Sequence, residues 1–298
     1  MAEKVAVVGA GTMGAGIAGV FAACGYDVAV YSRSEETLSA ARTVVGEIAG
    51  QDAAVEYSSL LHACVDGADI VSENVAEEPE LKRQLFTQIE RSVSENCLLT
   101  SNTSSVPIGT IGADLRHPER LIGIHWFNPP AVMPLVELIR GPRTSDETVI
   151  RARGVCADIG KETIEVAQDV PGFVINRLQY ALLREALYLV ETGATSIEDI
   201  DRAVETTLAP RWCSSGPLRL MDLAGLDTVR RVSAVLMPAL SQSGEVSSLI
   251  EQLVAAQAFG TKSGSGFYQW TDDDIAAAKL DRDSIVRFMS ERRHRKDR

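Results

Sequence analysis

The chain of 298 residues carries 41 acidic and 29 basic side chains, which gives a formal net charge of −12 at pH 7, and it is 45% hydrophobic. This length suits two domains with separate cores, and the composition is that of an ordinary soluble globular protein. An acidic balance of this size excludes nucleic acid as a partner, because phosphate binding requires a basic surface. No apolar run in the sequence approaches the length that spans a membrane.

The cysteines and the start of the chain bear on where the protein is found. Five cysteines are scattered without a Cys-x-x-Cys pair. An odd, unpatterned set is typical of reduced thiols. The first apolar run begins at residue 4, which leaves no room for a secretory leader. We therefore expect a cytoplasmic protein, and we predict no metal site.

The chain opens with a predicted strand at 4–8, a glycine-rich turn and a predicted helix at 12–24. The turn has the G-x-G-x-x-G spacing that holds a dinucleotide pyrophosphate between a strand and a helix. The first glycine permits the tight turn, the second leaves room for the phosphates, and the third lets the helix approach the strand. The amides at the helix start then face the negative charge. The predicted cofactor contacts in this turn are Gly9, Gly11, Thr12, Met13 and Gly14.

The end of the second predicted strand, residues 27–31, bears on the choice of nicotinamide cofactor. An acidic residue at this place binds the ribose 2′-hydroxyl of NAD. Here the chain has Ser32, which can hydrogen-bond a 2′-phosphate, and Arg33, which can pair with it. These two residues favour NADP, and the neighbouring Glu35 and Glu36 keep NAD as the alternative.

Strands and helices continue to alternate to residue 166, which predicts a doubly wound, mainly parallel sheet of the Rossmann type. The run Asp169-Val170-Pro171-Gly172 breaks this alternation, so we predict a dinucleotide-binding domain over residues 1–170. The further strands are predicted at 69–72, 97–100, 121–126, 134–139 and 161–166, and the further helices at 35–49, 79–92 and 145–159.

The pattern becomes helical after this break. Residues 173–191 form a predicted helix that is apolar on most faces, which indicates burial against other helices or a partner subunit. Ser196 begins a capping sequence for the next helix, which we expect to end near Leu208. Residues 171–298 are therefore predicted to form an all-helical domain, with its remaining helices at 217–224, 226–240 and 246–258.

Two ionisable residues lie in apolar surroundings. His125 ends a predicted strand, and Glu137 lies twelve residues later inside the apolar run Leu135–Ile139. Ligands bind at the carboxyl ends of such strands, and a buried carboxylate is costly unless it is paired. The proline-rich link between the two segments can return the chain and place Glu137 beside His125. A carboxylate there fixes the tautomer of the imidazole, so the pair predicts a general base that removes the proton of an alcohol.

A cluster of hydroxyl and amide side chains, Ser101–Pro107, follows another apolar strand. These side chains can hold a polar substrate, or they can form an ordinary cap for the following helix. The sequence pattern alone leaves both interpretations open.

Together these motifs resemble the 3-hydroxyacyl-CoA dehydrogenase family, in order and over essentially the whole chain. The matching runs include GAGTMGAGIA from residue 9, SNTSSVPI at 101–108, HWFNPPAVMPLVELI at 125–139 and DVPGFVINRLQ at 169–179. The resemblance implies a Rossmann domain, a helical domain through which relatives form homodimers, and interconversion of a 3-hydroxyacyl and a 3-ketoacyl group. It also implies catalytic roles for Ser104, His125, Glu137 and Asn176, and places near the cofactor for Glu77, Lys82 and Asn102.

Two segments depart from the pattern of relatives that act on CoA thioesters. Those relatives carry a longer, lysine-rich arm between positions matching Ser34 and Leu81, whereas the only Lys or Arg here is Arg42. A CoA phosphate would find little to pair with in that span. The dipeptide Arg211-Trp212 resembles relatives of the carnitine and gulonate dehydrogenase types, which oxidise small free hydroxy acids.

The substrate class therefore stays open between a CoA thioester, a free hydroxy acid and a carrier-bound hydroxyacyl group. For a free acid, Arg211, Arg140 or Arg143 is the candidate partner of the substrate carboxylate. A non-enzymatic structural role is a further alternative, since the family includes a lens crystallin. The four catalytic candidates together favour an enzyme.

Overall fold

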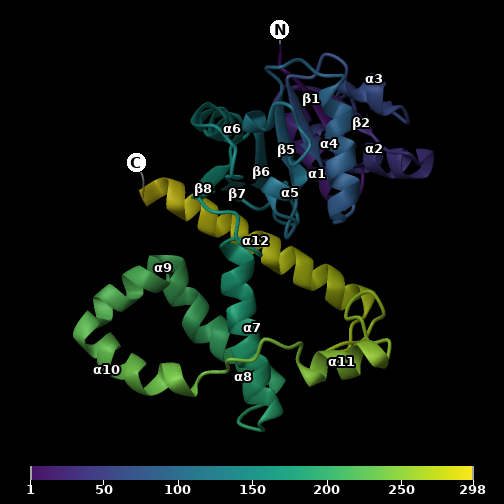
Figure 1. Cartoon of the computed structure of the whole chain (residues 1–298). Coiled ribbons are helices and arrows are strands. Elements are labelled where there is room, and N and C mark those ends of the chain that lie inside the picture. Colours follow the sequence, from purple (N-terminus) through teal and green to yellow (C-terminus); the bar gives the residue numbers. More distant parts are fainter. Residues whose placement is uncertain (1, 297–298) are drawn as a thin grey trace. The chain divides into compact units, whose positions relative to one another are not determined.

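A computed structural model describes residues 2–296 of the chain. The chain divides into two compact units, Met1–Arg177 (unit 1) and Leu178–Arg298 (unit 2) (Figure 1). Unit 1 contains an eight-stranded sheet with helices, and unit 2 is helical.

The sheet of unit 1 has the strand order β3-β2-β1-β4-β5-β6-β7-β8. Neighbouring strands from β3 to β6 pair in parallel, and the order reverses between β1 and β4. Such a reversal is where ligands bind in doubly wound sheets. The predicted fold class is confirmed. The strands are β1 (Lys4–Val8), β2 (Asp27–Tyr31), β3 (Val55–Ser58), β4 (Ile70–Glu73), β5 (Leu98–Ser101), β6 (Leu121–His125), β7 (Leu135–Ile139) and β8 (Glu162–Val166).

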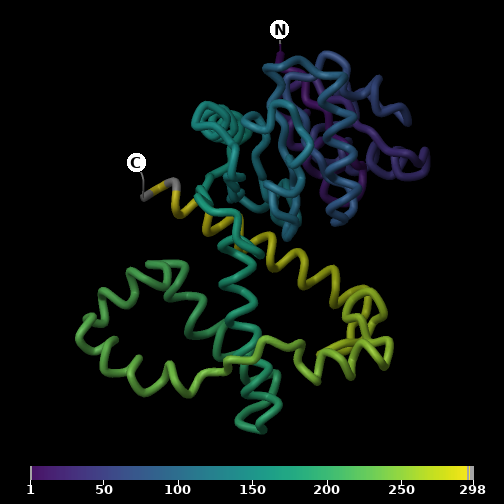
Figure 2. The backbone as a smooth tube through the Cα atoms, viewed as in Figure 1, coloured from purple at the N-terminus to yellow at the C-terminus, as the bar shows by residue number. Residues whose placement is uncertain are grey.

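Both faces of this sheet are covered, and each face has its own buried cluster. Alternate residues of a strand point to opposite sides, so one strand contributes to both clusters. Val5 and Val7 of β1 enter one buried cluster, and Ala6 and Val8 enter the other. Figure 2 follows the chain as it alternates between strands and covering helices. The helices of unit 1 are α1 (Thr12–Ala23), α2 (Glu35–Ala49), α3 (Leu61–Val65), α4 (Pro79–Glu90), α5 (Ile108–Ile111), the 3-10 turn η1 (Pro118–Arg120) and α6 (Asp146–Asp158).

Strand β7 runs antiparallel to β6, and β8 runs parallel to β7. The link from Trp126 to Pro134 contains no helix and is shorter than the roughly twelve residues that a parallel crossover needs. The chain therefore turns straight back, and the register places His125 opposite Glu137. This reversal brings Glu137, the middle residue of β7, beside the last residue of β6.

Unit 2 has almost no interior. Among the described side chains of residues 178–295, Leu187 alone is buried. In Figure 1, α9 and α10 extend away from α7 as an arm. The helices are α7 (Ile175–Glu191), which starts in unit 1, α8 (Ile197–Ala203), the π-helical turn η2 (Val204–Leu208), α9 (Ala209–Ala224), α10 (Leu226–Leu236), the 3-10 turn η3 (Met237–Ala239), α11 (Ser248–Ala255) and α12 (Asp272–Lys296).

Several elements differ from the sequence-based expectation. The predicted loop over residues 209–216 is helical, and α9 breaks only at Gly216, whose φ of 68° is left-handed, just before Pro217. The strand β3 and the helices α3, α5 and α12 were not predicted. The signal for α12 was present, because the Thr271 hydroxyl accepts the Asp274 amide and the Asp274 carboxylate accepts the Thr271 amide, which together form a capping box.

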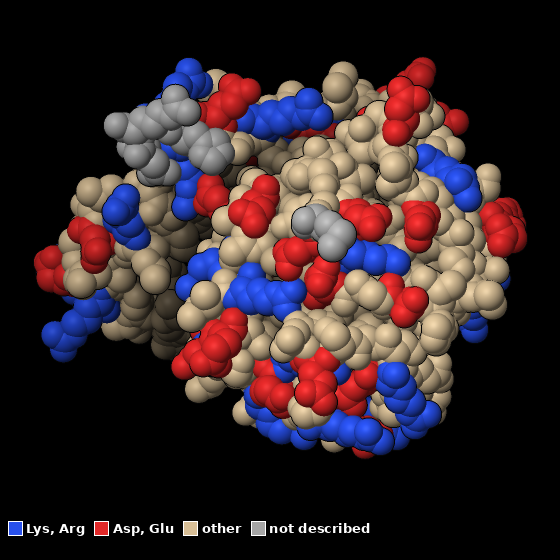
Figure 3. Space-filling view, turned by 90° about the horizontal axis from the view of Figure 1, so that it is seen from above, with Lys and Arg blue, Asp and Glu red and all other residues tan. Residues whose placement is uncertain are grey.

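The surface carries charges of both signs. On the face shown in Figure 3, acidic and basic side chains are interspersed, and uncharged residues lie between them. Among the described residues, no helix combines the length and the apolar character needed to cross a membrane.

Candidate active site

His125 and Glu137 form a buried, hydrogen-bonded pair, as predicted from the sequence. His125 Nδ1 lies 2.7 Å from Glu137 Oε2, and the side chains are 7% and 0% exposed. Burial acts to raise the pKa of Glu137, but hydrogen bonds from His125 and from the Ile175 and Val174 amides outweigh it and lower the pKa. The ionised carboxylate must accept, so Nδ1 carries the proton and Nε2 of His125 is the free base.

The second oxygen of Glu137 holds the start of α7. Oε1 accepts the backbone amides of Val174 and Ile175, both at 2.9 Å. Phe173, which has a left-handed φ of 50°, packs its ring edge-on against the His125 ring at 5.5 Å. The carboxylate therefore orients the imidazole with one oxygen and fixes the first turn of α7 with the other.

The two asparagines predicted to line the site have different partners. Asn176 lies in the first turn of α7, half-buried, and forms no hydrogen bond with any described residue, so its amide is available to a ligand. Asn102 has a partner on each side-chain atom, because its Nδ2 donates to Asn74 Oδ1 at 3.0 Å and its Oδ1 accepts the Trp126 amide at 2.8 Å. Asn102 thus ties the end of β4 to the end of β6.

Ser104 lies on the loop after β5, and Glu77 organises this loop. Glu77 Oε1 accepts the amides of Ser104 and Ser105 at 2.7 Å and the Thr103 hydroxyl at 2.7 Å. The Ser104 hydroxyl also donates to this oxygen, at 3.2 Å. Burial acts to raise the pKa of Glu77, but the Thr103 hydroxyl, the Lys82 ammonium and these amides outweigh it and lower the pKa to about 2.

Lys82 is a buried cation that pairs with two carboxylates. Its side chain is 1% exposed, and Nζ lies 2.8 Å from Glu73 Oε1 and 3.2 Å from Glu77 Oε2. Lys82 therefore forms a buried ion pair, and its place near the cofactor stays a prediction. Glu73 was missed altogether, although a carboxylate that closes an apolar strand was the same signal that singled out Glu137.

The glycine-rich turn fits a dinucleotide pyrophosphate. A Cβ atom at Gly9 would lie 2.6 Å from the Asn74 carbonyl oxygen, and one at Gly14 would lie 1.8 Å from the Gly9 carbonyl oxygen. A Cβ at Gly11 meets no described atom within 4 Å, so open space adjoins the middle glycine. Helix α1 begins at Thr12, followed by Met13, and no described side chain caps it. Its first amides are therefore free to bind an anion.

Ser32 follows β2 at the position where NAD-binding domains carry an acidic residue, and the cationic Arg33 comes next. Ser32 is half-buried, and its hydroxyl oxygen accepts the Ser34 amide at 3.3 Å. Arg33 is exposed and forms no ion pair with any described residue. Glu35 and Glu36 follow in the first turn of α2.

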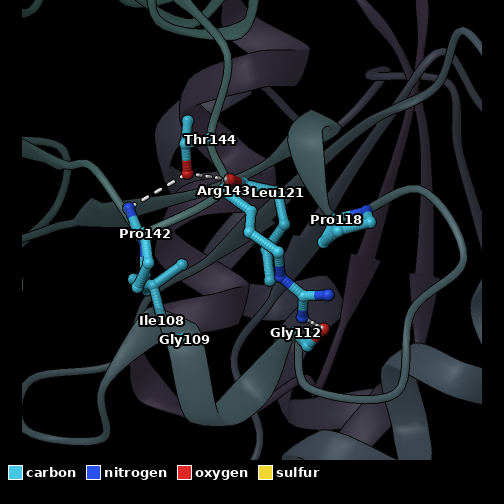
Figure 4. A pocket seen from close by; sticks show the side chains of 9 residues that line it. Ile108, Gly109, Gly112, Pro118, Leu121, Pro142, Arg143 and Thr144 are labelled. Atoms are coloured by element: carbon cyan, nitrogen blue, oxygen red, sulfur yellow. Dashed lines mark hydrogen bonds between the residues drawn. The ribbon is translucent and has the colours of Figure 1, made fainter.

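Two of the three arginines proposed for a substrate carboxylate lie elsewhere. Arg140 follows the end of β7 and pairs with Asp146 at 2.7 Å and with Glu165 at 3.2 Å. Arg143 donates to the carbonyl oxygens of Gly112 and Ala113 and lines a small cavity near the start of β6 (Figure 4). Because His125 is at the other end of β6, neither arginine can bind a carboxylate beside it.

Three of the five thiols are buried, and the described part of the chain holds no cluster of side chains that could bind a metal ion. No group of three or more His, Cys, Asp or Glu side chains among the described residues could hold a metal ion. Cys64, Cys97 and Cys156 are buried, and burial raises the pKa of each thiol to about 12. These thiols are therefore poor nucleophiles at neutral pH.

Both parts of the chain match the domains of one known enzyme family. Residues 4–170 match the NAD binding domain of 3-hydroxyacyl-CoA dehydrogenase, and residues 172–270 match the C-terminal domain of the same enzyme. The chain belongs to the 3-hydroxyacyl-CoA dehydrogenase family. As a member of this family it is an NAD-dependent oxidoreductase that acts on a small-molecule substrate.

Three relatives illustrate the range of the family. A 5-formyl-3-hydroxy-2-methylpyridine 4-carboxylate 5-dehydrogenase from Mesorhizobium japonicum is 35% identical over 294 residues, which cover 95% of each chain. A solved structure of an enzyme of this name, described as an NAD+ dependent dismutase, is 33% identical, with a TM-score of 0.91 over 100% of both chains. An (S)-3-hydroxybutyryl-CoA dehydrogenase from Ralstonia eutropha is 34% identical, with a TM-score of 0.74, and covers 91% of this chain and 100% of its own.

Proposed function

We propose that the chain interconverts a hydroxyl and a carbonyl group, with His125 as the general base and acid. The observation that carries this proposal is the 2.7 Å hydrogen bond between His125 and the buried carboxylate of Glu137. His125 takes the hydroxyl proton on Nε2, and Glu137 stabilises the imidazolium that forms. A bound nicotinamide would supply the hydride chemistry at the carbon that bears this hydroxyl oxygen. In the reverse direction His125 gives its proton to the carbonyl oxygen.

Ser104 and Asn176 are proposed to hold the substrate oxygen. The Ser104 hydroxyl lies 3.2 Å from Glu77 Oε1, and by rotating away from it the hydroxyl can donate to the substrate oxygen while the proton of that oxygen faces Nε2 of His125. The Asn176 side chain has no partner among the described residues and sits one residue beyond the two amides held by Glu137. Both groups would align the substrate oxygen with Nε2 of His125.

We propose a small free substrate rather than a CoA thioester. The only Lys or Arg between Ser34 and Leu81 is Arg42, and its guanidinium lies over the Tyr57 ring at 4.0 Å. The relative that acts on a pyridine carboxylate matches over 95% of the chain, and that substrate carries a carboxylate. Arg211 is the remaining candidate partner for such a group, because it is exposed and only its Nε is engaged, with the Thr207 carbonyl.

A CoA thioester is the second candidate, favoured by the 34% identity to the (S)-3-hydroxybutyryl-CoA dehydrogenase. The test is a panel of hydroxy and keto compounds, offered as free aliphatic acids, as pyridine alcohols and aldehydes that bear a carboxylate, and as CoA thioesters. We expect the highest kcat/KM on a free carboxylate, and we expect Arg211→Met to raise KM for it by about tenfold. Turnover of acetoacetyl-CoA that exceeds every free acid would replace the first candidate by the second.

We propose that NADP is accepted in addition to NAD, because Arg33 forms no ion pair within the described residues and Ser32 stands where an acid would repel a 2′-phosphate. The measurement is kcat/KM for NADPH and NADH in parallel, in the wild type and in Ser32→Asp. We expect Ser32→Asp to lower kcat/KM for NADPH about tenfold or more while leaving NADH nearly unchanged. Equal effects on the two cofactors would contradict a role of this position in cofactor choice.

We propose that unit 2 forms a homodimer and that the protein works in the reducing environment of the cytoplasm. Apolar side chains of unit 2 such as Leu218, Leu223 and Val235 are 83%, 73% and 72% exposed. A single buried side chain among those that the structure describes is too little core for a stable unit. All five cysteines are free, which supports a reducing compartment. Sedimentation of the purified protein tests the assembly, and a monomer at micromolar concentration would contradict it.

A further inference from the structure

Three charged side chains meet where β4 ends and α4 begins, and the proposed reaction uses only one of them. Glu73 is the last residue of β4 and Lys82 lies in α4, and their side chains are 0% and 1% exposed. Lys82 Nζ lies 2.8 Å from Glu73 Oε1 and 3.2 Å from Oε2 of Glu77, whose side chain is 33% exposed. One ammonium therefore serves two carboxylates, and two negative charges against one positive leave this cluster with a net charge of −1.

Glu73 is fixed on every side. Its Oε1 accepts the Val75 amide at 2.7 Å as well as Lys82, and its Oε2 accepts the Ser101 hydroxyl at 2.6 Å and Lys82 at 3.0 Å. Because β4 and β5 are paired central strands, these contacts fix the carboxylate against the core of the sheet. The ammonium of Lys82 is held in turn, and its remaining contacts are Glu77 and the Val75 carbonyl at 3.5 Å.

Glu77, which Lys82 holds in place, fixes the loop that carries Ser104 through hydrogen bonds. Its Oε1 collects the amides of Ser104 and Ser105 and the Thr103 hydroxyl, each at 2.7 Å. Without an ammonium beside them, the carboxylates of Glu77 and Glu73 would repel each other, and one of them would take up a proton. A protonated Glu77 would accept these hydrogen bonds weakly, and the loop would lose its organising charge.

We propose that Glu73 and Lys82 are positioning residues, which keep Glu77 ionised and so fix the loop that carries Ser104. This proposal rests on the role given to Ser104 in the proposed function. Neither side chain offers an exposed surface to a ligand, since Glu73 is 0% exposed and the ammonium of Lys82 is directed at Glu73, Glu77 and Val75.

The decisive experiment compares Lys82→Met with the double variant Lys82→Met/Glu73→Gln. The single change takes the net charge of the cluster from −1 to −2, and the second change returns it to −1. We expect Lys82→Met to lower kcat/KM about 100-fold and to move the acid limb of its pH profile to higher pH. Amide exchange at Ser104 and Ser105 in the ligand-free protein should become faster. The double variant should regain at least tenfold in kcat/KM, the original acid limb and the amide protection.

A role in packing alone predicts the opposite sign. Removing a second buried side chain would then lower activity and amide protection further, and that result would overturn the proposal. If Lys82→Met does not fold, the double variant decides by itself, because the proposal requires it to fold with wild-type protection at Ser104. Amide exchange is measured without substrate, so this outcome is independent of whether His125 is the base.

Two matched controls separate the cluster from its helix. Arg83→Met removes the charge of the residue that follows Lys82 in α4. Arg83 pairs with Glu80 and Asp114, which lie outside the cluster, so this change should leave the pH profile and the amide exchange unchanged. Glu90→Gln removes a buried carboxylate near the end of α4, which faces Arg120, and should lower the thermal midpoint without moving the acid limb. A shift of the acid limb in either control would contradict the assignment to Glu73 and Lys82.

Discussion

The two units differ most in what they bury. Unit 1 packs both faces of its sheet and encloses whole charged side chains, such as Glu73 and Glu137, with hydrogen-bonding partners on both oxygens. In unit 2, Leu187 is the single buried side chain among those described, and apolar residues such as Leu218 are exposed. Buried charges require a rigid and fully satisfied environment, whereas exposed apolar helices require a partner surface.

From this difference we expect the proposed chemistry in unit 1 and the proposed assembly through unit 2. The acid–base pair, the Ser104 loop and the glycine-rich turn all lie in unit 1 and are held by contacts within it. Substitutions in unit 1 should therefore change the reaction or its pH dependence while leaving assembly intact. Substitutions on the exposed face of unit 2 should change assembly first.

The largest expected effect is on turnover in His125→Gln. This substitution removes the base, and general acid–base catalysis contributes about 10²- to 10⁴-fold, so kcat should fall by that factor. Cofactor affinity, measured by fluorescence titration, should stay within about twofold, because the glycine-rich turn is untouched. Turnover at the wild-type rate would remove the proposed mechanism.

Glu137→Gln should come next, with kcat lowered about 100-fold or more. An amide nitrogen facing Nδ1 of His125 would donate to it, which forces the proton onto Nε2 and removes the base. The amide oxygen can still accept from Val174 and Ile175, so protection of these two amides against exchange should persist. Glu137→Ala should lose both activity and protection, and equal protection in the two variants would contradict the tie to α7.

An acidic substitution in unit 2 should act on assembly. Leu223→Glu places a charge on a residue that is 73% exposed in the single chain, so it should cost little in a monomer. Within an apolar interface it should raise the dimer dissociation constant about 10- to 100-fold, measured by sedimentation. Glu36→Gln, on an exposed position of unit 1, is the matched surface change and should leave the dissociation constant unchanged.

The smallest expected effect is on stability in acid. The pKa of Glu77 is lowered to about 2, so its contribution to stability is present above its ordinary pKa of 4.5 and is lost as the pH falls towards 2. In urea unfolding between pH 5 and pH 3, the free energy of the wild type should fall more steeply than that of Glu77→Gln, by at most about 1.4 kcal/mol per pH unit. Glu191→Gln in unit 2, which removes an exposed carboxylate, should change this slope less. Identical slopes for the wild type and Glu77→Gln would contradict the ionised state of Glu77.

The sequence predicted the parts of the molecule whose signal is local. Apolar periodicity located most strands and helices of unit 1, and the short proline-rich link predicted that Glu137 returns beside His125. Because β7 runs antiparallel to β6, Arg140 lies near the start of β6, at the opposite end from His125, and pairs with Asp146. Its proposed contact with a substrate near His125 was therefore wrong. Strand β3 escaped prediction because Val55–Ser58 is short and only partly buried.

The partner of Lys82 could not be predicted from spacing, because the pairing depends on a lysine of α4 reaching back to the strand before it. Glu73 ends an apolar run just as Glu137 lies in one, but nothing local distinguishes its partner from the many charged residues nearby. Helix α12 carried a readable cap at Thr271, yet its apolar residues follow no single face, so periodicity alone did not reveal it.

The protonation of His125 tests the central claim most directly. The protein has four histidines, so 15N labelling of histidine gives few side-chain signals, and His125→Gln identifies the relevant one. The account predicts a proton on Nδ1 and a bare Nε2 at neutral pH, with the proton moving to Nε2 in Glu137→Gln. A wild-type His125 that carries its proton on Nε2 would contradict the account.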